Sequence, residues 1–107
     1  MKGTYLGEFQ EIVLLTVIVL NDNAYGVLIQ KEISKHSGRS ISRGALHSAL
    51  SRLEEKGYLS GKLGEASKKR GGKRKKYYHL TPLGQRALDE AEAIRKSFQM
   101  AIQAVQS

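Results

Sequence analysis

Residues 42–57 carry the clearest helical pattern of apolar and polar positions in the chain. The apolar positions recur at i, i+4 and i+7, which places them on one face of an α-helix. Ser40 or Ser42 can cap the start of this helix, and Gly57 stands where a left-handed residue is favoured after its end. The apolar face consists of Leu46, Leu50 and Leu53. The opposite face carries short or polar residues, namely Gly44, His47, Ser48, Ser51 and Arg52.

A second helix is predicted over residues 24–37, immediately before this one. The preceding residues are typical of a turn, and Asp22 or Asn23 can cap the helix that follows. Gly38 ends the helix, so residues 39–41 leave only a short connection to the next one. Two helices joined by so short a turn have the layout of a helix-turn-helix.

Residues 6–20 fit either a helix or a buried strand, because many of them are β-branched. We favour a helix, since Glu8 and Glu11 suit its first turn and no strand partner of matching length lies nearby. This helix is apolar on almost every side. We therefore expect its own domain to cover one side and a second subunit to cover the other.

A β-hairpin is predicted after the helix at 42–57. Residues 59–63 and 77–80 alternate with the period of two that is typical of half-buried strands. The segment between them, residues 64–74, contains glycines that can form the turn. The tip of the hairpin and the start of its return strand carry a run of cations, namely Lys68, Lys69, Arg70, Lys73, Arg74, Lys75 and Lys76.

Residues 82–107 are predicted to form one long helix, with Thr81 as its N-cap and Pro82 as its first residue. Its apolar residues follow a heptad spacing, and a helix of about 25 residues is about 37 Å long. We expect this seam to pack on a second subunit; packing against residues 6–20 is the alternative, and both can hold in part. The heptad positions are Ala87, Ala91, Ile94, Phe98, Ala101 and Val105.

Together these elements predict a mainly α fold with a small β-hairpin. Residues 1–81 form a winged helix-turn-helix domain, and residues 82–107 form a C-terminal dimerisation helix in the same compact unit.

The composition favours a polyanionic partner. A formal net charge of +8 over 107 residues is typical of chains that bind nucleic acid or an anionic surface. The absence of cysteine excludes disulfides and thiolate chemistry, so the chain needs no oxidising compartment. The longest apolar run, residues 12–20, is shorter than the roughly 20 residues of a membrane span. We therefore expect a cytoplasmic protein with no membrane partner.

The residues that carry catalytic or metal chemistry are few and scattered. His36, His47 and His79 lie on different predicted elements, at spacings that match no metal-ligand motif. The chain shows neither a Ser/His/Asp order nor a phosphate-binding glycine motif. We expect no metal, no cofactor and no enzymatic activity.

Three blocks of residues form a recognisable set. They are Ala24-Tyr25-Gly26; Gly44-Ala45-Leu46 with Leu50, Arg52-Leu53-Glu54 and Gly57; and Gly72-Lys73-Arg74-Lys75-Lys76-Tyr77-Tyr78-His79-Leu80-Thr81 with Gly84. On these residues, nearly the whole chain resembles the PadR family of bacterial transcriptional regulators, in the short subgroup that ends with one dimerisation helix. The resemblance implies a homodimeric repressor that binds a palindromic operator and leaves it when a small molecule, often toxic or phenolic, is bound. His47 stands where the family commonly has Tyr, and the chain lacks the Trp with which some short members hold flat drugs.

The polar face of the helix at 42–57 is predicted to read bases in the major groove, because its short side chains allow close approach and its donors can reach base edges. An ordinary solvated face is the alternative. We expect the hairpin cations to neutralise phosphates or enter a minor groove, although such a run can also serve only solubility. Tyr25 and Tyr77 can either contact phosphate or pack in the domain. The predicted base-reading residues are Ser42, Arg43, His47, Ser48, Ser51 and Arg52.

The dimer interface is expected to combine the heptad positions with Phe9 and Val13. An apolar pocket for an apolar or aromatic effector is expected near Phe9, Ile94, Phe98 and Met100. The chain is thus predicted to be a dimeric, sequence-specific repressor of transcription that binds double-stranded DNA. The alternative is a winged-helix protein-interaction module that has only non-specific affinity for nucleic acid.

Overall fold

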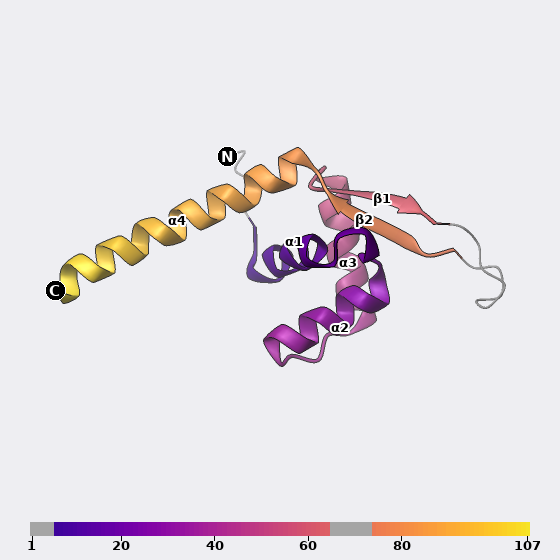
Figure 1. Ribbon diagram of the computed structural model, residues 1–107, viewed down its shortest axis with the longest axis horizontal. Helices are drawn as coiled ribbons and strands as arrows, with labels where there is room; N and C mark the ends of the chain where they lie inside the picture. Colours follow the sequence, from indigo (N-terminus) through magenta and orange to yellow (C-terminus); the bar gives the residue numbers. More distant parts are fainter. Residues whose placement is uncertain (1–5, 65–73) are drawn as a thin grey trace.

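The computed structural model describes residues 6–64 and 74–107 of the chain. Its elements are α1 (Glu8–Leu20), the short 3₁₀ helix η1 (Asn21–Asn23), α2 (Gly26–Ser37), α3 (Arg43–Glu55), β1 (Leu59–Leu63), β2 (Lys76–Leu80) and α4 (Pro82–Gln106). Helices α1, α2 and α3 pack together beside the β1–β2 hairpin, while α4 extends from this body on the side opposite to the hairpin (Figure 1). The predicted mainly α fold with a small hairpin is confirmed.

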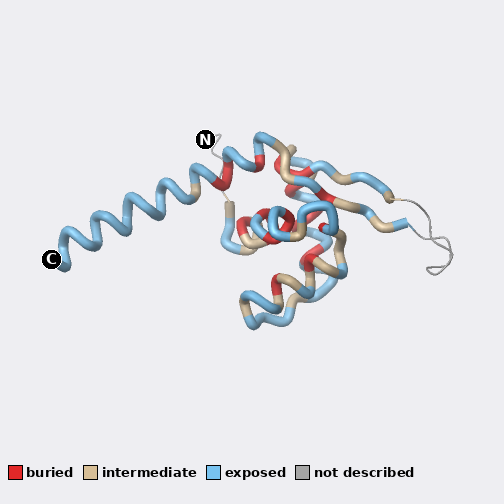
Figure 2. The backbone as a smooth tube through the Cα atoms, viewed as in Figure 1, coloured by how far each residue is buried: buried red, intermediate tan, exposed pale blue. Residues whose placement is uncertain are grey.

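The hydrophobic core lies where α1, α2, α3 and the hairpin meet (Figure 2). Leu14 of α1 and Leu53 of α3 are completely buried there. Residues 8–20 form a helix in the structure, so the alternative interpretation of this segment as a strand is wrong. On the other side of α1, Leu15, Ile18 and Val19 are 46%, 45% and 61% exposed. The body of a single chain thus covers only one side of α1.

Helix α3 has both of its predicted end signals. Ser42 is the N-cap, since its Oγ accepts a hydrogen bond from the backbone N–H of Ala45 at 3.1 Å. Gly57 follows the helix with a φ of +82°, a left-handed conformation that side chains disfavour. This turn lets the N–H of Tyr58 donate to the carbonyl of Leu53 at 2.9 Å, which closes the end of the helix and starts the hairpin.

Helix α2 begins later than predicted. Tyr25 occupies the N-cap position and no side chain caps the helix, so the predicted cap by Asp22 or Asn23 is wrong. The cause is a tertiary contact: Tyr25 forms a β-bridge with Tyr77 of β2, which keeps its backbone extended. The end of α2 is as predicted, at Gly38.

The hairpin leads directly into α4. Strands β1 and β2 are antiparallel, with Leu59 opposite Leu80 at the base. Thr81 follows at once and is the predicted N-cap of α4, because its Oγ1 accepts a hydrogen bond from the N–H of Gly84 at 3.0 Å. The same hydroxyl donates to the carbonyl of Gly57 at 2.5 Å, which fastens the start of α4 to the end of α3.

Only the first turns of α4 pack on the body. Ala87 and Leu88 are buried, whereas residues 92–107 are all exposed (Figure 2). Within this exposed segment, Arg95 still reaches back to the body and forms a bidentate ion pair with Glu11 of α1, in which the Nη2–Oε1 distance is 2.6 Å. The predicted intramolecular contact between α4 and α1 therefore exists in the first half of α4 and extends as far as Arg95. None of the described helices is long and apolar enough to cross a membrane.

Two residues assigned by sequence to a subunit interface need correction. Val13 and Ala87 are both 0% exposed within a single chain, so neither offers surface to a second subunit. They belong to the core because Val13 faces the inner side of α1 and Ala87 lies in the buried first turns of α4. Phe9 is half-buried and packs against the same core.

Candidate nucleic-acid interface

The polar face of α3 is open to solvent. The opposite face of the helix is buried in the core, so the polar face points outward. The buried residues are Leu46, Ala49, Leu50 and Leu53. The Ser42 hydroxyl caps the helix, so this predicted contact residue has a structural role. The structure places every predicted base-reading residue in an exposed position, and these are Ser42, Arg43, His47, Ser48, Ser51 and Arg52.

Polar contacts fix the turn that presents α3. The Gln30 amide donates from Nε2 to the carbonyl of Ile41 at 2.5 Å, which ties α2 to the connection before α3. Arg39 in the same connection forms a bidentate pair with Glu8 of α1, with both N–O distances at 3.0 Å. The Arg39 hydrogen bonds lower the pKa of the exposed Glu8 carboxyl. The start of α3 is thus tied to both α1 and α2.

A groove of about 820 Å³ separates α3 from the N-terminal half of α2 and from β2. Buried or half-exposed apolar side chains form its floor, and cations stand at its rim. Among the described residues, no carboxylate pairs with Arg43, Arg74 or Lys75. The lining residues with functional side chains are Gln30, Arg43, His47, Arg74, Lys75, Lys76 and Tyr78.

Lys76 differs from the other rim cations because it has a carboxylate partner. Its Nζ lies 2.8 Å from Oε1 of Glu54, near the end of α3, and this hydrogen bond raises the pKa of Lys76. The pair crosses above Gly61 of β1, where a Cβ would overlap the Lys76 side chain. The ion pair links the hairpin to α3 and reduces the charge that Lys76 can offer to a phosphate.

Tyr25 packs within the domain, which is one of the two alternatives predicted for it, and its contact with phosphate stays a prediction. Its ring packs edge-to-face on Tyr77, with the ring centroids 5.4 Å apart. The ammonium group of Lys75 lies 3.9 Å from the centre of the Tyr25 ring. This cation–π contact holds Lys75 beside the uncapped N-terminus of α2, where backbone N–H groups also favour an anion.

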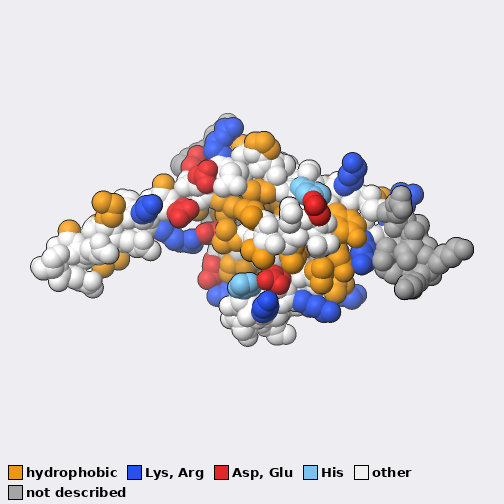
Figure 3. Space-filling view, in the orientation of Figure 1, with side chains coloured by type: hydrophobic (Ala, Val, Ile, Leu, Met, Phe, Trp, Pro, Cys, Tyr) orange, Lys and Arg blue, Asp and Glu red, His pale blue; other side chains and the backbone are white. Residues whose placement is uncertain are grey.

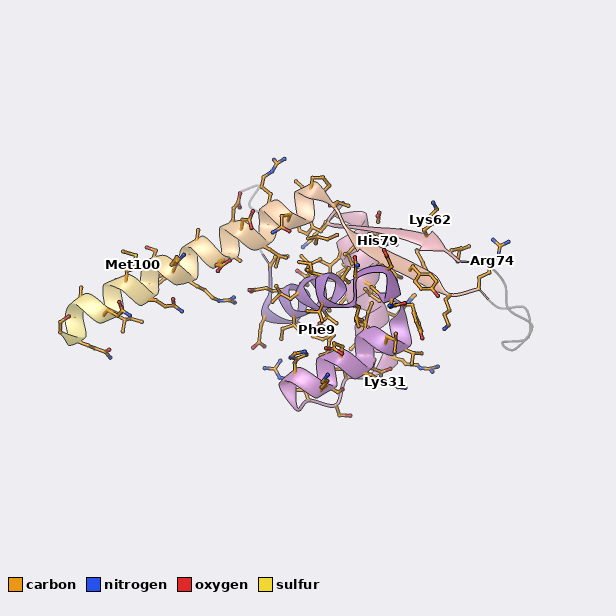
Figure 4. All side chains as sticks on the ribbon, viewed as in Figure 1. Phe9, Lys31, Lys62, Arg74, His79 and Met100 are labelled. Atoms are coloured by element: carbon orange, nitrogen blue, oxygen red, sulfur yellow. The ribbon has the colours of Figure 1, made fainter. Side chains whose placement is uncertain are left out.

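Many of the basic residues lie on the hairpin, α2 and α3. Figure 3 shows their side chains along the right and lower margins, while other lysine and arginine side chains lie at the upper left and along α4. Lys62 and Arg74 project from the hairpin on the side away from α4 (Figure 4). Four of the predicted wing cations lie outside the described residues, and these are Lys68, Lys69, Arg70 and Lys73.

Sequence reasoning missed Glu54 and Gln30 and the contacts that these residues make at this interface. Glu54 and Lys76 stand 22 positions apart, and Gln30 and Ile41 stand 11 apart, so no local spacing connects either pair. A patterned helix face shows which residues point outward, but only the folded chain shows which of them meet another element.

A helix-turn-helix followed directly by a hairpin, with a polar helix face and cations on one side, defines a winged helix-turn-helix DNA-binding protein. The family model of the transcriptional regulator PadR-like family matches residues 14–90. The chain belongs to this family, and the resemblance seen in the sequence is confirmed.

Individual relatives agree with this assignment. An uncharacterized protein from Lysinibacillus sphaericus is 36% identical over 86 residues, which cover 78% of this chain and 74% of that protein. The structure of a transcriptional regulator from Clostridium thermocellum superposes with a TM-score of 0.71 at 29% identity, covering 89% of each chain. A PadR-like transcription factor from Bacteroides fragilis gives a TM-score of 0.73 at 26% identity, covering 91% of this chain and 88% of its own. The family and these solved structures are transcriptional regulators rather than enzymes, and the chain is a DNA-binding regulator.

Proposed function

We propose that the protein is a cytoplasmic, homodimeric repressor that binds a palindromic operator and is released from it by an apolar or aromatic small molecule. Residues 1–81 act as the DNA-binding domain and residues 82–107 as the dimerisation helix. The observation that carries the proposal is the exposed polar face of α3 beside the cationic rim of the groove. Such a face reads base edges in the major groove while the rim cations contact phosphates.

The exposed apolar surface of α4 supports a dimer. Ile94, Phe98 and Val105 are 58%, 66% and 85% exposed along one stripe of the helix. The body of the chain covers only the first turns of α4, and an isolated helical segment of this length is marginal in water. A second copy supplies the missing cover, with the exposed apolar side of α1 as a further part of the interface. The remaining heptad positions, Ala91 and Ala101, allow close approach of the two helices.

The proposed effector site requires both subunits. Phe9 and Met100, two of the residues expected near it, lie on separate parts of one chain (Figure 4). A groove of about 390 Å³ at the base of α4 is lined instead by Leu15, Ile18 and Leu88 together with polar residues. A molecule bound between this groove and the partner's α4 would change the angle of the two bodies and separate the paired α3 helices from their half-sites.

Selection of bound duplexes from a random DNA library tests the proposal. The expected result is a palindromic motif whose half-sites are centred about 10 base pairs apart, or a multiple of this. Ser48→Ala is expected to reduce discrimination at a base position by about fivefold, because one hydrogen bond to a base edge is lost. Ser107→Ala, at the far end of α4, is the matched control and should recover the original motif. A selection that yields no motif would refute sequence-specific reading by α3.

Removal of Arg74 and Lys75, which have no carboxylate partner in the part of the chain that the structure describes, should affect all duplexes alike. For the double variant Arg74→Ala/Lys75→Ala we expect weaker binding to every sequence. The slope of log K against the logarithm of the salt concentration should be shallower by about 1.8, since each lost phosphate contact removes about 0.9 from it. Titrations at several salt concentrations measure this slope. The control variant Arg86→Ala/Lys96→Ala removes the same charge from α4 and should keep the slope. An unchanged slope in the first variant would show that Arg74 and Lys75 do not contact phosphate.

A further inference from the structure

His47 lies in the groove between α2, α3 and β2, and its side chain is exposed. On the described residues, every charged side chain that lines this groove is cationic. Helix α2 contributes Val27 and Gln30, which carry no charge. The cations that share the groove with His47 are Arg43 of α3 and, from the hairpin, Arg74, Lys75 and Lys76.

The remaining titratable groups near His47 do not supply a negative charge to it. Glu54 follows two turns later on the same side of α3, but Lys76 holds its carboxylate at 2.8 Å. Tyr78 lies in the floor of the groove, and burial raises the pKa of its hydroxyl, so it stays neutral at physiological pH. In the absence of DNA, the charged side chains that surround the His47 imidazole in this groove are therefore cationic.

The other two histidines have carboxylate neighbours. Nε2 of His36 lies 2.9 Å from Oε2 of Glu32, and Nε2 of His79 lies 3.5 Å from Oδ1 of Asp22. Within the described part of the chain, His47 has no such partner. A protonated His47 thus lacks a counter-charge until an anion enters the groove.

We propose that a DNA phosphate, rather than the base edge expected from the sequence, lies beside His47 in this groove and that the imidazole takes up a proton when the phosphate binds. The inference rests on the proposed DNA-binding function and adds to it a dependence of affinity on pH. A phosphate beside the imidazole favours its charged form, because opposite charges attract at short range. The imidazolium then donates a charge-assisted hydrogen bond to the phosphate, which strengthens binding as the pH falls.

Fluorescence-anisotropy titration at constant ionic strength tests this coupling. The probe is a mixed-sequence duplex of about 30 base pairs, or about three helical turns, because phosphate contact does not need a particular sequence. We expect the Kd to rise by a factor of about ten between about pH 5.5 and pH 8, the range in which imidazole loses its charge. His47→Gln keeps a donor at this exposed position and should give a Kd that is the same at both pH values.

His36→Gln and His79→Gln are the matched controls, and both should keep the pH dependence of the unaltered protein. A Kd that does not change with pH, or a dependence that persists in His47→Gln, would overturn the inference while DNA binding stands. If no duplex binds at any pH, the proposed function fails and this inference fails with it.

Ring-proton NMR gives a second readout that does not depend on affinity. The His47 signal, assigned by its loss in His47→Gln, is expected to titrate at a higher pH in the DNA complex than in the free protein. The His36 and His79 signals serve as references, because no phosphate is proposed beside either. Equal midpoints for His47 with and without DNA would contradict proton uptake.

Discussion

Phe98→Glu is expected to convert the proposed homodimer into a monomer. The Phe98 side chain is 66% exposed in a single chain and lies in the middle of the exposed stripe of α4, so the proposed dimer buries it. Full burial of a Phe side chain contributes about 1.5 to 3 kcal/mol, and a carboxylate in an apolar seam adds a desolvation cost. We expect the dimer dissociation constant to rise at least about a hundredfold, which corresponds to about 2.7 kcal/mol. Sedimentation velocity over a range of protein concentrations measures this change.

Gln103→Glu is the matched control for this variant. It introduces the same charge on the opposite side of α4, at an exposed position away from the stripe. It should remain dimeric and bind the operator as before, whereas Phe98→Glu should lose most operator affinity because one α3 then binds one half-site. A dimeric Phe98→Glu protein would show that the subunits associate through another surface.

Gly84→Ala is expected to destabilise the fold strongly. A Cβ at this position would overlap the carbonyl oxygen of Tyr58 and lie 2.7 Å from Cδ1 of Leu80. The Tyr58 carbonyl cannot move freely, because it accepts a hydrogen bond from the N–H of Thr81 at 3.1 Å. Overpacking of this kind costs about 1 to 3 kcal/mol, and the contact with backbone places the expected loss at the upper end of that range. Thermal unfolding should therefore show a Tm lower by about 10 °C or more.

Gly44→Ala provides the comparison for this substitution. A Cβ at Gly44 would meet no atom within 4 Å, and the residue lies in α3 with ordinary helical geometry. The same chemical change should leave stability unaltered or raise it by up to about 1 kcal/mol, since Ala is the better helix former. Both variants should be compared at one protein concentration, because the proposed dimerisation would make Tm depend on it. Equal effects at the two glycines would refute the close packing of α4 on the hairpin.

The elements of the fold were predictable from the sequence because local chemistry determines them. The spacing of Leu46, Leu50 and Leu53, the Ser42 cap and the Thr81 cap all act over a few residues, and the structure confirms each. The start of α2 was not predictable in this way. Tyr25 stays extended because it pairs with β2, a contact between segments about 50 positions apart in the chain.

Hydrophobic periodicity identifies an apolar face but does not say what covers it. Ala87 and Phe98 occupy the same heptad stripe, yet Ala87 is completely buried in its own chain and Phe98 is 66% exposed. The difference arises because α4 leaves the body after its first turns, and the sequence contains no signal for that point. The assignment of Val13 to the interface failed for the same reason, since α1 is apolar on both sides.

For the candidate site, sequence reasoning found the exposed face of α3 and the basic hairpin but not the contacts between them. The pairing of Lys76 with Glu54 and the position of Lys75 over Tyr25 depend on how the hairpin folds against α2 and α3. These contacts distinguish cations with the same sequence context. Arg74 and Lys75 have no carboxylate partner among the described residues, whereas Lys76 does.

Sequence-specific DNA reading by α3 is the central claim, and one titration tests it most directly. Fluorescence anisotropy should be measured for the dimer with duplex from the region upstream of its own gene and with a scrambled duplex, at two salt concentrations. We predict a preference of about a thousandfold or more for the upstream site, as is typical of specific regulators, and a steep weakening of both interactions with salt. Equal affinity for the two duplexes would contradict reading of this site by α3 and would favour a protein-interaction module with only non-specific affinity for nucleic acid.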